Sequence, residues 1–422
     1  MSTSYTNAEI TVTLNKLGAD RYTKTSYPIR YGKYSEVVTD DAVYQFNLNG
    51  EIVFTRGRNG DWHSPQEWLK RSVGNDWVYY STGGYTGVYE AIGEFYLPNL
   101  SYPTNSLLGG KPFTAEYVIR RINGWYDQLL IIAQRLKNAP PETLKFLEKI
   151  TQNNPQLLEQ KAEHLFQISG GRVTVMPPDC RHVDYDIIPL SVTSGCLYKC
   201  RFCKVKNSRP FREKKHEEID CQIEQFKQLY GNNLANYNSI FLGEHDALCG
   251  SRETLLYGIV KSYEGLGFSH SYMRGANYFL FGSVDSLLNT EELFFQELSR
   301  LPCEFYINIG LESADQETLD KIGKPITSAM VKDAFRRIQE INEKYLNVEV
   351  TSNFIMDETL PENHYISFLG LVRDSLSHKK PKGCVYLSPL KFGSPSRELV
   401  FDFNRVKLQS RLPTYLYIIQ RL

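Results

Sequence analysis

The chain has 422 residues, which exceeds one small domain and suits a barrel of roughly 200 to 250 residues with an accessory domain. Its 48 lysines and arginines balance 48 aspartates and glutamates, so no global basic surface favours nucleic acid binding. No apolar run approaches the roughly 18 residues of a membrane span, and the N-terminus lacks a secretory signal pattern. Eight cysteines, three of them clustered, do not form a disulfide framework and favour a cytoplasmic location.

Residues 1–112 are expected to form a β-rich accessory domain, because apolar and polar residues alternate there between turn signals. The clearest hairpin joins residues 43–48 to residues 51–54 through Asn49 and Gly50, a dipeptide that readily adopts positive φ. The many aromatic residues of this region are interpreted as its core rather than as an exposed recognition surface.

Residues 113–172 are expected to be a helical linker. Apolar residues recur at helical spacing over 114–137, and prolines open two further helices near residues 141 and 155. These helices are expected to connect the accessory domain to a second domain at residues 173–422 and to pack on its flank.

The second domain is predicted to consist of parallel βαβ units, because strand and helix patterns alternate along it. Six strands are expected, at residues 185–192, 239–242, 279–281, 305–310, 347–354 and 383–389. Six helices are expected between these strands, at residues 217–230, 251–263, 290–301, 315–322, 328–344 and 362–376. In such a fold the functional residues belong to the loops at the C-terminal ends of the strands.

Three cysteines directly follow the first expected strand in the pattern C-x3-C-x2-C. Cys196, Cys200 and Cys203 could take three corners of a four-iron, four-sulfur cluster, which leaves one iron without a protein ligand. Structural zinc normally needs four protein ligands, often as paired C-x2-C units, and the chain has no second such pair. The pattern therefore favours an iron–sulfur cluster over zinc or three unrelated thiols.

With Phe202 before the last cysteine, this segment resembles the radical S-adenosylmethionine (radical SAM) superfamily. The resemblance implies a partial (β/α)6 barrel, a 4Fe-4S cluster and S-adenosylmethionine (SAM) as cofactors, and sensitivity to oxygen. It also implies reductive cleavage of SAM to a 5'-deoxyadenosyl radical, with electrons from a reductase, flavodoxin or ferredoxin.

Further motifs at the strand ends resemble the SAM pocket of that superfamily. Gly243 and Glu244 resemble its Gly-Gly-Glu motif, which meets the SAM amino group, although Leu242 replaces the first glycine. Residues 310–313 resemble the G-[IL]-E-S segment of the branch that contains coproporphyrinogen dehydrogenase, the methylthiotransferases and the Elongator catalytic subunit. By this resemblance Glu312 would bind the ribose hydroxyls. Ser283, Ile355 and Met356 complete the expected pocket, the last two against adenine.

Candidates for substrate chemistry lie in two places. His245 and Asp246 directly follow Glu244 and could act as acid or base, or support Glu244. His182, Asp184 and Asp186 precede the first strand; if that segment is extended they share one face, where they could bind a second metal or a diol, or form ordinary salt bridges.

Three cations are further candidates: Arg274 and Arg336 for the SAM carboxylate, and Lys391 for either that carboxylate or an anionic substrate. The function that these observations favour is hydrogen abstraction from a small-molecule substrate, by a lyase or rearrangement enzyme. A modified nucleobase such as queuine is one concrete substrate. The alternatives are a tRNA-modifying radical SAM enzyme and a non-catalytic iron–sulfur redox sensor.

Overall fold

In the computed structural model, the described part of the chain begins at residue 2. It comprises residues 2–22, 30–59, 62, 67–81, 96–98, 112–203, 210–389, 398–417 and 421–422. No helix in these ranges is both long and apolar enough to cross a membrane.

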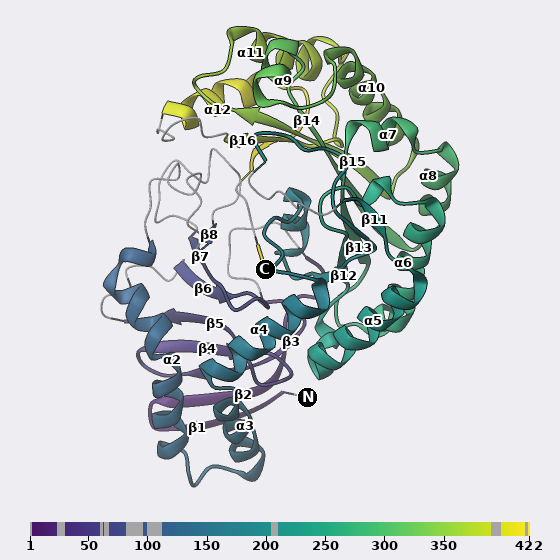
Figure 1. Cartoon of the computed structure of the whole chain (residues 1–422). Coiled ribbons are helices and arrows are strands. Elements are labelled where there is room, and N and C mark those ends of the chain that lie inside the picture. Colours follow the sequence, from purple (N-terminus) through teal and green to yellow (C-terminus); the bar gives the residue numbers. More distant parts are fainter. Residues whose placement is uncertain are drawn as a thin grey trace.

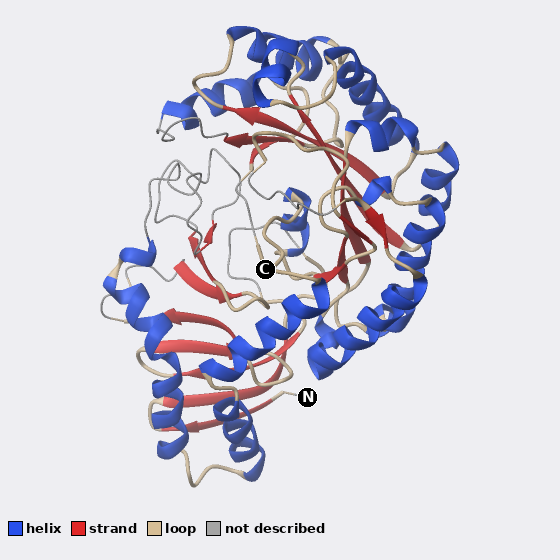
Figure 2. Cartoon of the chain, in the orientation of Figure 1, coloured by secondary structure: helices blue, strands red, loops and turns tan. Residues whose placement is uncertain are grey.

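The N-terminal region forms an eight-stranded antiparallel sheet in which each strand pairs with the next along the chain (Figures 1 and 2). Its strands are β1 (Thr3–Asn7), β2 (Ile10–Leu17), β3 (Lys33–Val38), β4 (Ala42–Phe46), β5 (Ile52–Gly57), β6 (Glu67–Arg71), β7 (Trp77–Ser81) and β8 (Tyr96–Pro98). The predicted β-rich domain is therefore confirmed.

The hairpin between β4 and β5 shows how local chemistry sets this sheet. The Asn47 side-chain oxygen accepts hydrogen bonds from the backbone N–H groups of Asn49 (2.9 Å) and Glu51 (3.1 Å). Gly50 has φ of 80°, which a residue without Cβ adopts at little cost. The expected Asn-Gly turn is thus confirmed.

Three helices follow the sheet: α2 (Glu116–Arg135), α3 (Pro141–Gln152) and α4 (Pro155–Ser169), the first of them after a single 3-10 turn at Pro112–Thr114. Helix α2 packs on β5, whereas α4 packs on α5 of the second domain. Trp77 and Tyr79 share a buried cluster with Trp125 and Leu129 of α2. The aromatic residues of the sheet therefore supply core, as predicted.

The second domain is built on a seven-stranded parallel sheet with the order β17-β16-β15-β14-β13-β12-β9. Its strands are β9 (Ile188–Leu190), β12 (Ser239–Leu242), β13 (Ala276–Gly282), β14 (Cys303–Glu312), β15 (Val348–Met356), β16 (Val385–Pro389) and β17 (Thr414–Leu416). The sheet curves into an open arc, and the C-terminus of the chain lies inside it (Figure 1). The predicted fold class, a partial barrel after a β-rich domain, is confirmed, with a seventh strand that the sequence did not indicate.

Helices cover the outer face of this arc (Figure 2). They are α5 (His216–Tyr230), α6 (Arg252–Gly265), α7 (Val284–Asn289), α8 (Glu292–Ser299), α9 (Gln316–Ile322), α10 (Ser328–Lys344), α11 (Glu362–Leu369) and α12 (Glu398–Gln409). Helix α10 has the predicted bounds, whereas the helix expected at 362–376 continues from α11 into a π-helical turn at Gly370–Asp374. Helices α7 and α12 were not predicted. Single 3-10 turns occur at Gly231–Asn236, Ala247–Cys249 and Phe268–His270.

The first predicted strand of the barrel, at 185–192, is shortened to the three residues of β9. Residues Pro178–Val183 form a 3-10 helix, η3, and Asp184 and Tyr185 have positive φ values of 53° and 59°. Side chains of η3 fill the inside of the barrel, where Asp179 accepts hydrogen bonds from Thr351 and Tyr386 at 2.7 Å each. The predicted strand was too long at its start because Tyr185 lies in the left-handed turn that follows η3.

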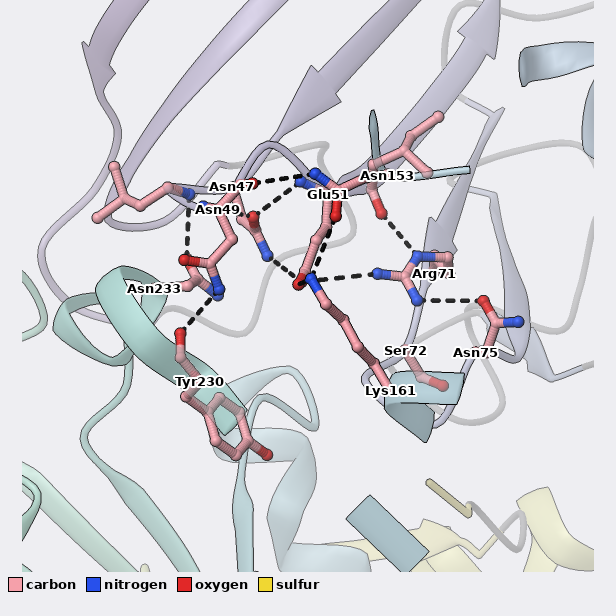
Figure 3. Close-up of polar contacts among 12 residues, drawn as sticks. Asn47, Asn49, Glu51, Arg71, Ser72, Asn75, Asn153, Lys161, Tyr230 and Asn233 are labelled. Carbon is pink, nitrogen blue, oxygen red and sulfur yellow. Dashed lines mark hydrogen bonds and ion pairs between the residues drawn. The ribbon is translucent and has the colours of Figure 1, made fainter. Parts of the chain in front are cut away.

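Hydrogen bonds fix the N-terminal sheet to the barrel (Figure 3). The Asn49 side-chain amide donates to the backbone oxygen of Tyr230 (2.8 Å), and Asn233 accepts from the backbone N–H of Leu48 (3.4 Å). Asn236 both accepts from and donates to the backbone of Lys33, at 2.7 and 2.9 Å. All these barrel residues precede β12, so the sheet docks at the N-terminal end of the barrel strands.

Candidate active site

The three-cysteine loop begins directly after β9, at the C-terminal end of the barrel strands. A short antiparallel pair, β10 (Thr193–Ser194) with β11 (Arg212–Glu213), closes its base. Glu213 anchors this base to the start of α6 by accepting hydrogen bonds from the hydroxyls of Ser251 and Thr254, both at 2.7 Å. The strand pair and the Glu213 hydrogen bonds therefore fix the two ends of the loop, and the cysteines lie between these ends.

Side chains within the loop tie it to the neighbouring strand ends. Tyr198 hydrogen-bonds to the carboxylate of Asp285 and accepts from the backbone N–H of that residue (3.1 Å). Arg201 donates to the backbone oxygen of Asp320 (2.8 Å) at the C-terminal end of α9, where helix carbonyls favour a cation. Gly323 is required there, because an added Cβ would lie 2.4 Å from Arg201 Nε. Tyr198 and Arg201 thus shape the loop.

The three thiols suit an iron–sulfur cluster by their chemistry. None of the eight cysteines is in a disulfide, and Cys196, Cys200 and Cys203 come from one loop. Burial raises the pKa of Cys200 to about 11, an effect that the nearby Lys324 ammonium partly offsets. Within the described ranges, no three His, Cys, Asp or Glu side chains are arranged to hold a bare metal ion. Because a cluster is held by thiolates, loading iron would displace the thiol protons.

Gly243 and Glu244 follow β12 beside this loop. Glu244 Oε2 accepts a hydrogen bond from the backbone N–H of Gly195, at 3.4 Å. Gly243 has φ of 82°, and an added Cβ would lie 2.6 Å from the Cβ of Ala247. The chain passes this point only with glycine, which leaves the Glu244 carboxylate next to the first cysteine.

The sequence reasoning missed Lys324, which lies at the centre of the candidate site. Its ammonium is 3.3 Å from Glu312 Oε1 and 5.4 Å from the ring centroid of Tyr198. The side chain of Lys324 is only 5% exposed, and that of Glu312 is 12% exposed. Lys324 lies 12 residues after Glu312, a separation that carries no local sequence signal.

The backbone around Glu312 is unusual for a strand. Glu312 has φ of 64°, and the register with β15 shifts between Gly310 and Glu312. Non-glycine residues in this region carry strain, which is often found at functional sites. An added Cβ at Gly310 would lie 2.6 Å from Glu312 Oε1 and 3.3 Å from Lys324 Nζ, so glycine makes room for the ion pair.

Ile355 and Met356 do not face the same side of β15. Ile355 shares a buried cluster with Phe202, Ile322 and Leu360, whereas Met356 is buried in the main core. Neighbouring residues of a strand point to opposite faces, so the two cannot pack on the same adenine. The prediction for Met356 needs correction, because its side chain faces the outer, helix-covered side. Phe202 joins Ile355 in its place.

Ser283 and Asp246 hold each other. The Ser283 hydroxyl caps α7 by accepting from the backbone N–H of Ser286 (3.1 Å), and Asp246 Oδ1 accepts from the backbone N–H of Ser283 (2.9 Å) and from the Ser286 hydroxyl (2.9 Å). Burial raises the pKa of Asp246, which these hydrogen bonds partly offset. Both side chains therefore stabilise the start of α7 beside the loop. His245 is half-buried, and burial lowers its pKa, opposed by Glu244.

His182 does not join the cysteines. It belongs to η3 and stacks on Tyr306, with ring centroids 4.5 Å apart. Tyr306 lies six residues before Glu312 on β14, which at 3.3 Å per residue is about 20 Å along the strand. The structure therefore places His182 toward the opposite end of the barrel. Burial lowers the pKa of His182 to about 3, so the ring is neutral.

Asp184 and Asp186 are not arranged with His182 as metal ligands. Both carboxylates contact the ammonium of Lys70 on β6, each at 2.8 Å. The segment is not extended, since Asp184 has a left-handed backbone, so the three side chains do not share a strand face. The second metal or diol site considered from the sequence is replaced by an ion-paired cluster.

Two of the three cations considered for the SAM carboxylate lie elsewhere. Arg274 pairs with Asp20 (2.7 Å) before β13, at the wrong end of that strand. Arg336 pairs with Asp333 on the exposed side of α10 (2.7 Å). Lys391 lies outside the described residues. The buried Lys324 is the cation that the structure places beside the cysteine loop.

A hydrogen-bonded chain of polar side chains forms the floor of the barrel. Asn308 donates to the Thr351 hydroxyl (2.8 Å) and accepts from Asn353 (2.7 Å). Thr351 in turn donates to Asp179 of η3, which also accepts from Tyr386. This floor separates the cysteine end of the barrel from the end on which the N-terminal sheet docks.

The fold and the site together define an enzyme-type barrel with a three-thiolate loop and an acidic and basic pair at its mouth. A model of the family described as "Radical SAM superfamily" matches residues 190–366. Residues 190–366 therefore form a radical SAM domain, and the enzymes of that superfamily use a 4Fe-4S cluster and SAM. No curated protein matches the chain.

Solved structures of other radical SAM enzymes resemble the chain distantly. The cobalamin-dependent enzyme OxsB with aqua-cobalamin bound is 18% identical, with a TM-score of 0.36, over 56% of this chain and 33% of that chain. A radical SAM methyltransferase from Sphaerobacter thermophilus is 16% identical, with a TM-score of 0.38, over 55% of this chain and 66% of that chain. Methylornithine synthase (PylB) is 13% identical, with a TM-score of 0.34, over 60% of this chain and 78% of that chain. The chain thus spans about a third of the length of OxsB.

Proposed function

We propose that this chain is an enzyme in which Cys196, Cys200 and Cys203 hold a 4Fe-4S cluster that serves hydrogen abstraction from a small-molecule substrate. When bound, the cluster supplies an open iron and the electron that cleaves SAM to a 5'-deoxyadenosyl radical. The observation that carries the proposal is the buried pair of Glu312 and Lys324, which lies against the cysteine loop.

The charges of this site match the polar groups of SAM. Glu244, held near Gly195, offers a carboxylate to the SAM ammonium, together with the backbone around Gly243. Lys324 offers the ammonium that the SAM carboxylate needs, and Glu312 accepts from ribose hydroxyls. A redox sensor has no use for such a set, so the arrangement favours an enzyme over the sensor alternative.

Apolar groups complete the pocket. Phe202 and Ile355 lie in one cluster and would cover the adenine ring. Ser283 and Asp246 act as positioning residues, because they hold the start of α7 and, through Asp285, Tyr198 of the loop. His245, half-buried beside Glu244, remains the candidate for proton transfer to or from the substrate.

For the substrate we propose a lyase or rearrangement reaction on a small polar molecule, with a modified nucleobase such as queuine as one candidate. Asn308 and Asn353 support a polar substrate, because their amides lie on the barrel floor and both donate and accept hydrogen bonds. A reductase, flavodoxin or ferredoxin would supply electrons. The free thiols are consistent with a cytoplasmic protein. We also propose domain bounds of 1–112, 113–172 and 173–422.

The test is anaerobic reconstitution with iron and sulfide, followed by dithionite and SAM. We expect 5'-deoxyadenosine to form when a cell metabolite extract supplies the substrate. When deuterium-labelled candidate compounds then replace the extract, we expect the correct one to transfer its label into 5'-deoxyadenosine. Complete absence of 5'-deoxyadenosine from a protein that carries its full iron content would overturn the enzyme proposal. Label transfer from a tRNA instead of a small molecule would support the tRNA-modifying alternative.

A further inference from the structure

A second cavity, of about 170 Å³, lies between the N-terminal sheet and the barrel. Asp184, Asp186 and Tyr237 line it from segments that precede β9 and β12, whereas the cysteine loop and Glu244 follow these strands. The cavity is therefore at the opposite end of the strands from the candidate active site. A cavity of about 150 Å³ holds benzene, so this one has room for a single substituted ring.

Flat side chains form the walls of this cavity. Trp68 and Tyr80 of the sheet stack on each other, with ring centroids 5.2 Å apart and planes at 12°. The Arg30 guanidinium lies 3.4 Å from the ring centroid of Phe54 and presents a second planar surface. Aromatic rings and guanidinium planes bind flat ligands by stacking.

Gln45 Oε1 and the Tyr22 hydroxyl are buried on the cavity and lack a hydrogen-bond partner in the described part of the chain. The orientation of Gln45 is fixed, because its amide nitrogen donates to Glu36 Oε2 at 2.6 Å. A buried polar group without a partner costs free energy, so each such atom needs an explanation. A ligand that donates hydrogen bonds would supply one to the Gln45 carbonyl.

Ion pairs hold the remaining walls rigid. Lys70 joins Asp184 and Asp186, and the Tyr80 hydroxyl donates to Asp184 at 2.9 Å. The adjacent wall is a network around Glu51, which accepts from Asn47 (2.8 Å) and from Lys161 (2.5 Å) (Figure 3). Positioned groups of this kind lower the cost of ordering a site on binding.

We propose that this cavity binds a planar, amino-substituted nitrogen heterocycle of single-ring size. The flat walls select a planar ring, and the volume limits it to one ring with substituents. The Gln45 carbonyl and the Asp186 carboxylate accept hydrogen bonds, so the ligand must carry N–H donors, as an aminopyrimidine does. The site goes beyond the proposed radical chemistry, because neither the cysteines nor Glu312 contributes to it.

Isothermal titration calorimetry on the cluster-free full chain tests this proposal, with cytosine and 2-aminopyrimidine as probes. Pyrimidine, which lacks the amino group, and benzoate, an anion that cannot donate N–H bonds, serve as comparison ligands. We expect both amino compounds to bind and both comparison ligands to bind at least about tenfold more weakly, as the loss of one or two hydrogen bonds implies. Cytidine tests the size limit: we expect it to bind more weakly than cytosine, because its ribose exceeds the volume of a single substituted ring, and equal binding would contradict the proposed size of the ligand.

Two variants localise the binding. Tyr22→Phe removes only a hydroxyl that has no partner among the described residues, and Gln45→Leu removes the carbonyl; each should weaken cytosine binding about five- to tenfold. Tyr257→Phe is the matched control, because this hydroxyl bonds to Asp220 on the exposed side of α6. The proposal is overturned if no probe binds at millimolar concentration, if benzoate binds as well as cytosine, or if folded Tyr22→Phe and Gln45→Leu both bind cytosine like the unaltered chain.

Discussion

The two ends of β9 and β12 are built in different ways. At the C-terminal end, thiols, glycines and a strained Glu312 surround a buried ion pair and leave groups that match two cofactors. At the N-terminal end, aromatic rings and paired charges close a small cavity against a separate sheet. The first end is made from segments that directly follow strands, and the second from residues far apart in the chain. One barrel can therefore carry a site that its sequence motifs reveal and one that they do not.

Removal of one cysteine should give the largest difference between the two sites, because it should abolish activity at one and leave ligand binding at the other unchanged. Cys200→Ala should abolish iron–sulfur absorbance and 5'-deoxyadenosine formation, because two thiolates cannot hold the cluster stably. Cytosine binding should be unchanged. Iron content and calorimetry on the same preparation check both results, with Cys221→Ala, an exposed cysteine on α5, as the control. A normal iron content in Cys200→Ala would show that the ligand assignment is wrong.

Removal of the buried Lys324 ammonium should have the second-largest effect, a loss of SAM affinity. Lys324→Met should weaken SAM binding by about ten- to a hundredfold, as loss of a charged hydrogen bond implies. It should also lower the free energy of unfolding by about 3 kcal/mol, because Glu312 is left as a buried charge without its partner. Equilibrium SAM binding and urea unfolding measure the two effects.

Lys321→Met is the control for that variant, since Lys321 is exposed on the neighbouring helix α9 and donates to the backbone oxygen of Thr359 (2.8 Å). It should change neither quantity appreciably. SAM affinity that is the same in Lys324→Met and in Lys321→Met would contradict the role given to Lys324.

The floor between the two ends should make stability depend on pH. Burial raises the pKa of Asp179 to about 7, although hydrogen bonds from Thr351 and Tyr386 oppose the shift. The folded state therefore keeps a proton that the unfolded state loses near pH 4. This stabilisation is present at low pH and is lost as the pH rises to 7, by about 2 kcal/mol between pH 5 and 7.

Urea unfolding at pH 5 and pH 7 tests this dependence. Asp179→Asn should remove most of the difference between the two pH values, whereas Asp220→Asn on the exposed side of α5 should leave it unchanged. An equally steep pH dependence in Asp179→Asn would assign the effect to another group.

The smallest change concerns a single methyl group. Gly310→Ala should weaken SAM binding about tenfold, because the added Cβ would lie 2.6 Å from Glu312 Oε1 and displace the ion pair. Cytosine binding should stay the same. Gly124→Ala in α2 is the matched control, since nothing lies within 4 Å of its added Cβ. Normal SAM binding in Gly310→Ala would mean that the Glu312 and Lys324 side chains can move without consequence.

Much of the fold and the cysteine loop could be predicted because their signals are local. Helix α10 and strand β12 have the predicted bounds, since period and flanking polar residues mark both. Strand β9 was predicted too long, because the left-handed turn at Asp184 and Tyr185 leaves no signal in the alternation of apolar residues. Lys324 could not be found, as it meets Glu312 only through the bulge at the end of β14 and the turn after α9.

The second cavity was beyond sequence reasoning for a related reason. Gln45 and Tyr22 belong to the N-terminal sheet region, whereas Asp186 belongs to the barrel, and only the docking of the two brings them together. Asp184 and Asp186 were noticed as a polar group before β9, but their partner Lys70 lies more than a hundred residues earlier in the chain. The sequence indicated that Asp184 and Asp186 belong to an unusual polar group, but it did not identify Lys70 as their ion-pair partner.

The most direct test of the central claim is the electron paramagnetic resonance spectrum of the reduced, reconstituted protein with and without SAM. We expect SAM to change the spectrum, because the three-cysteine loop would leave one iron open beside Glu244, Glu312 and Lys324. A spectrum that SAM leaves unchanged, in a protein with a full complement of iron, would contradict it.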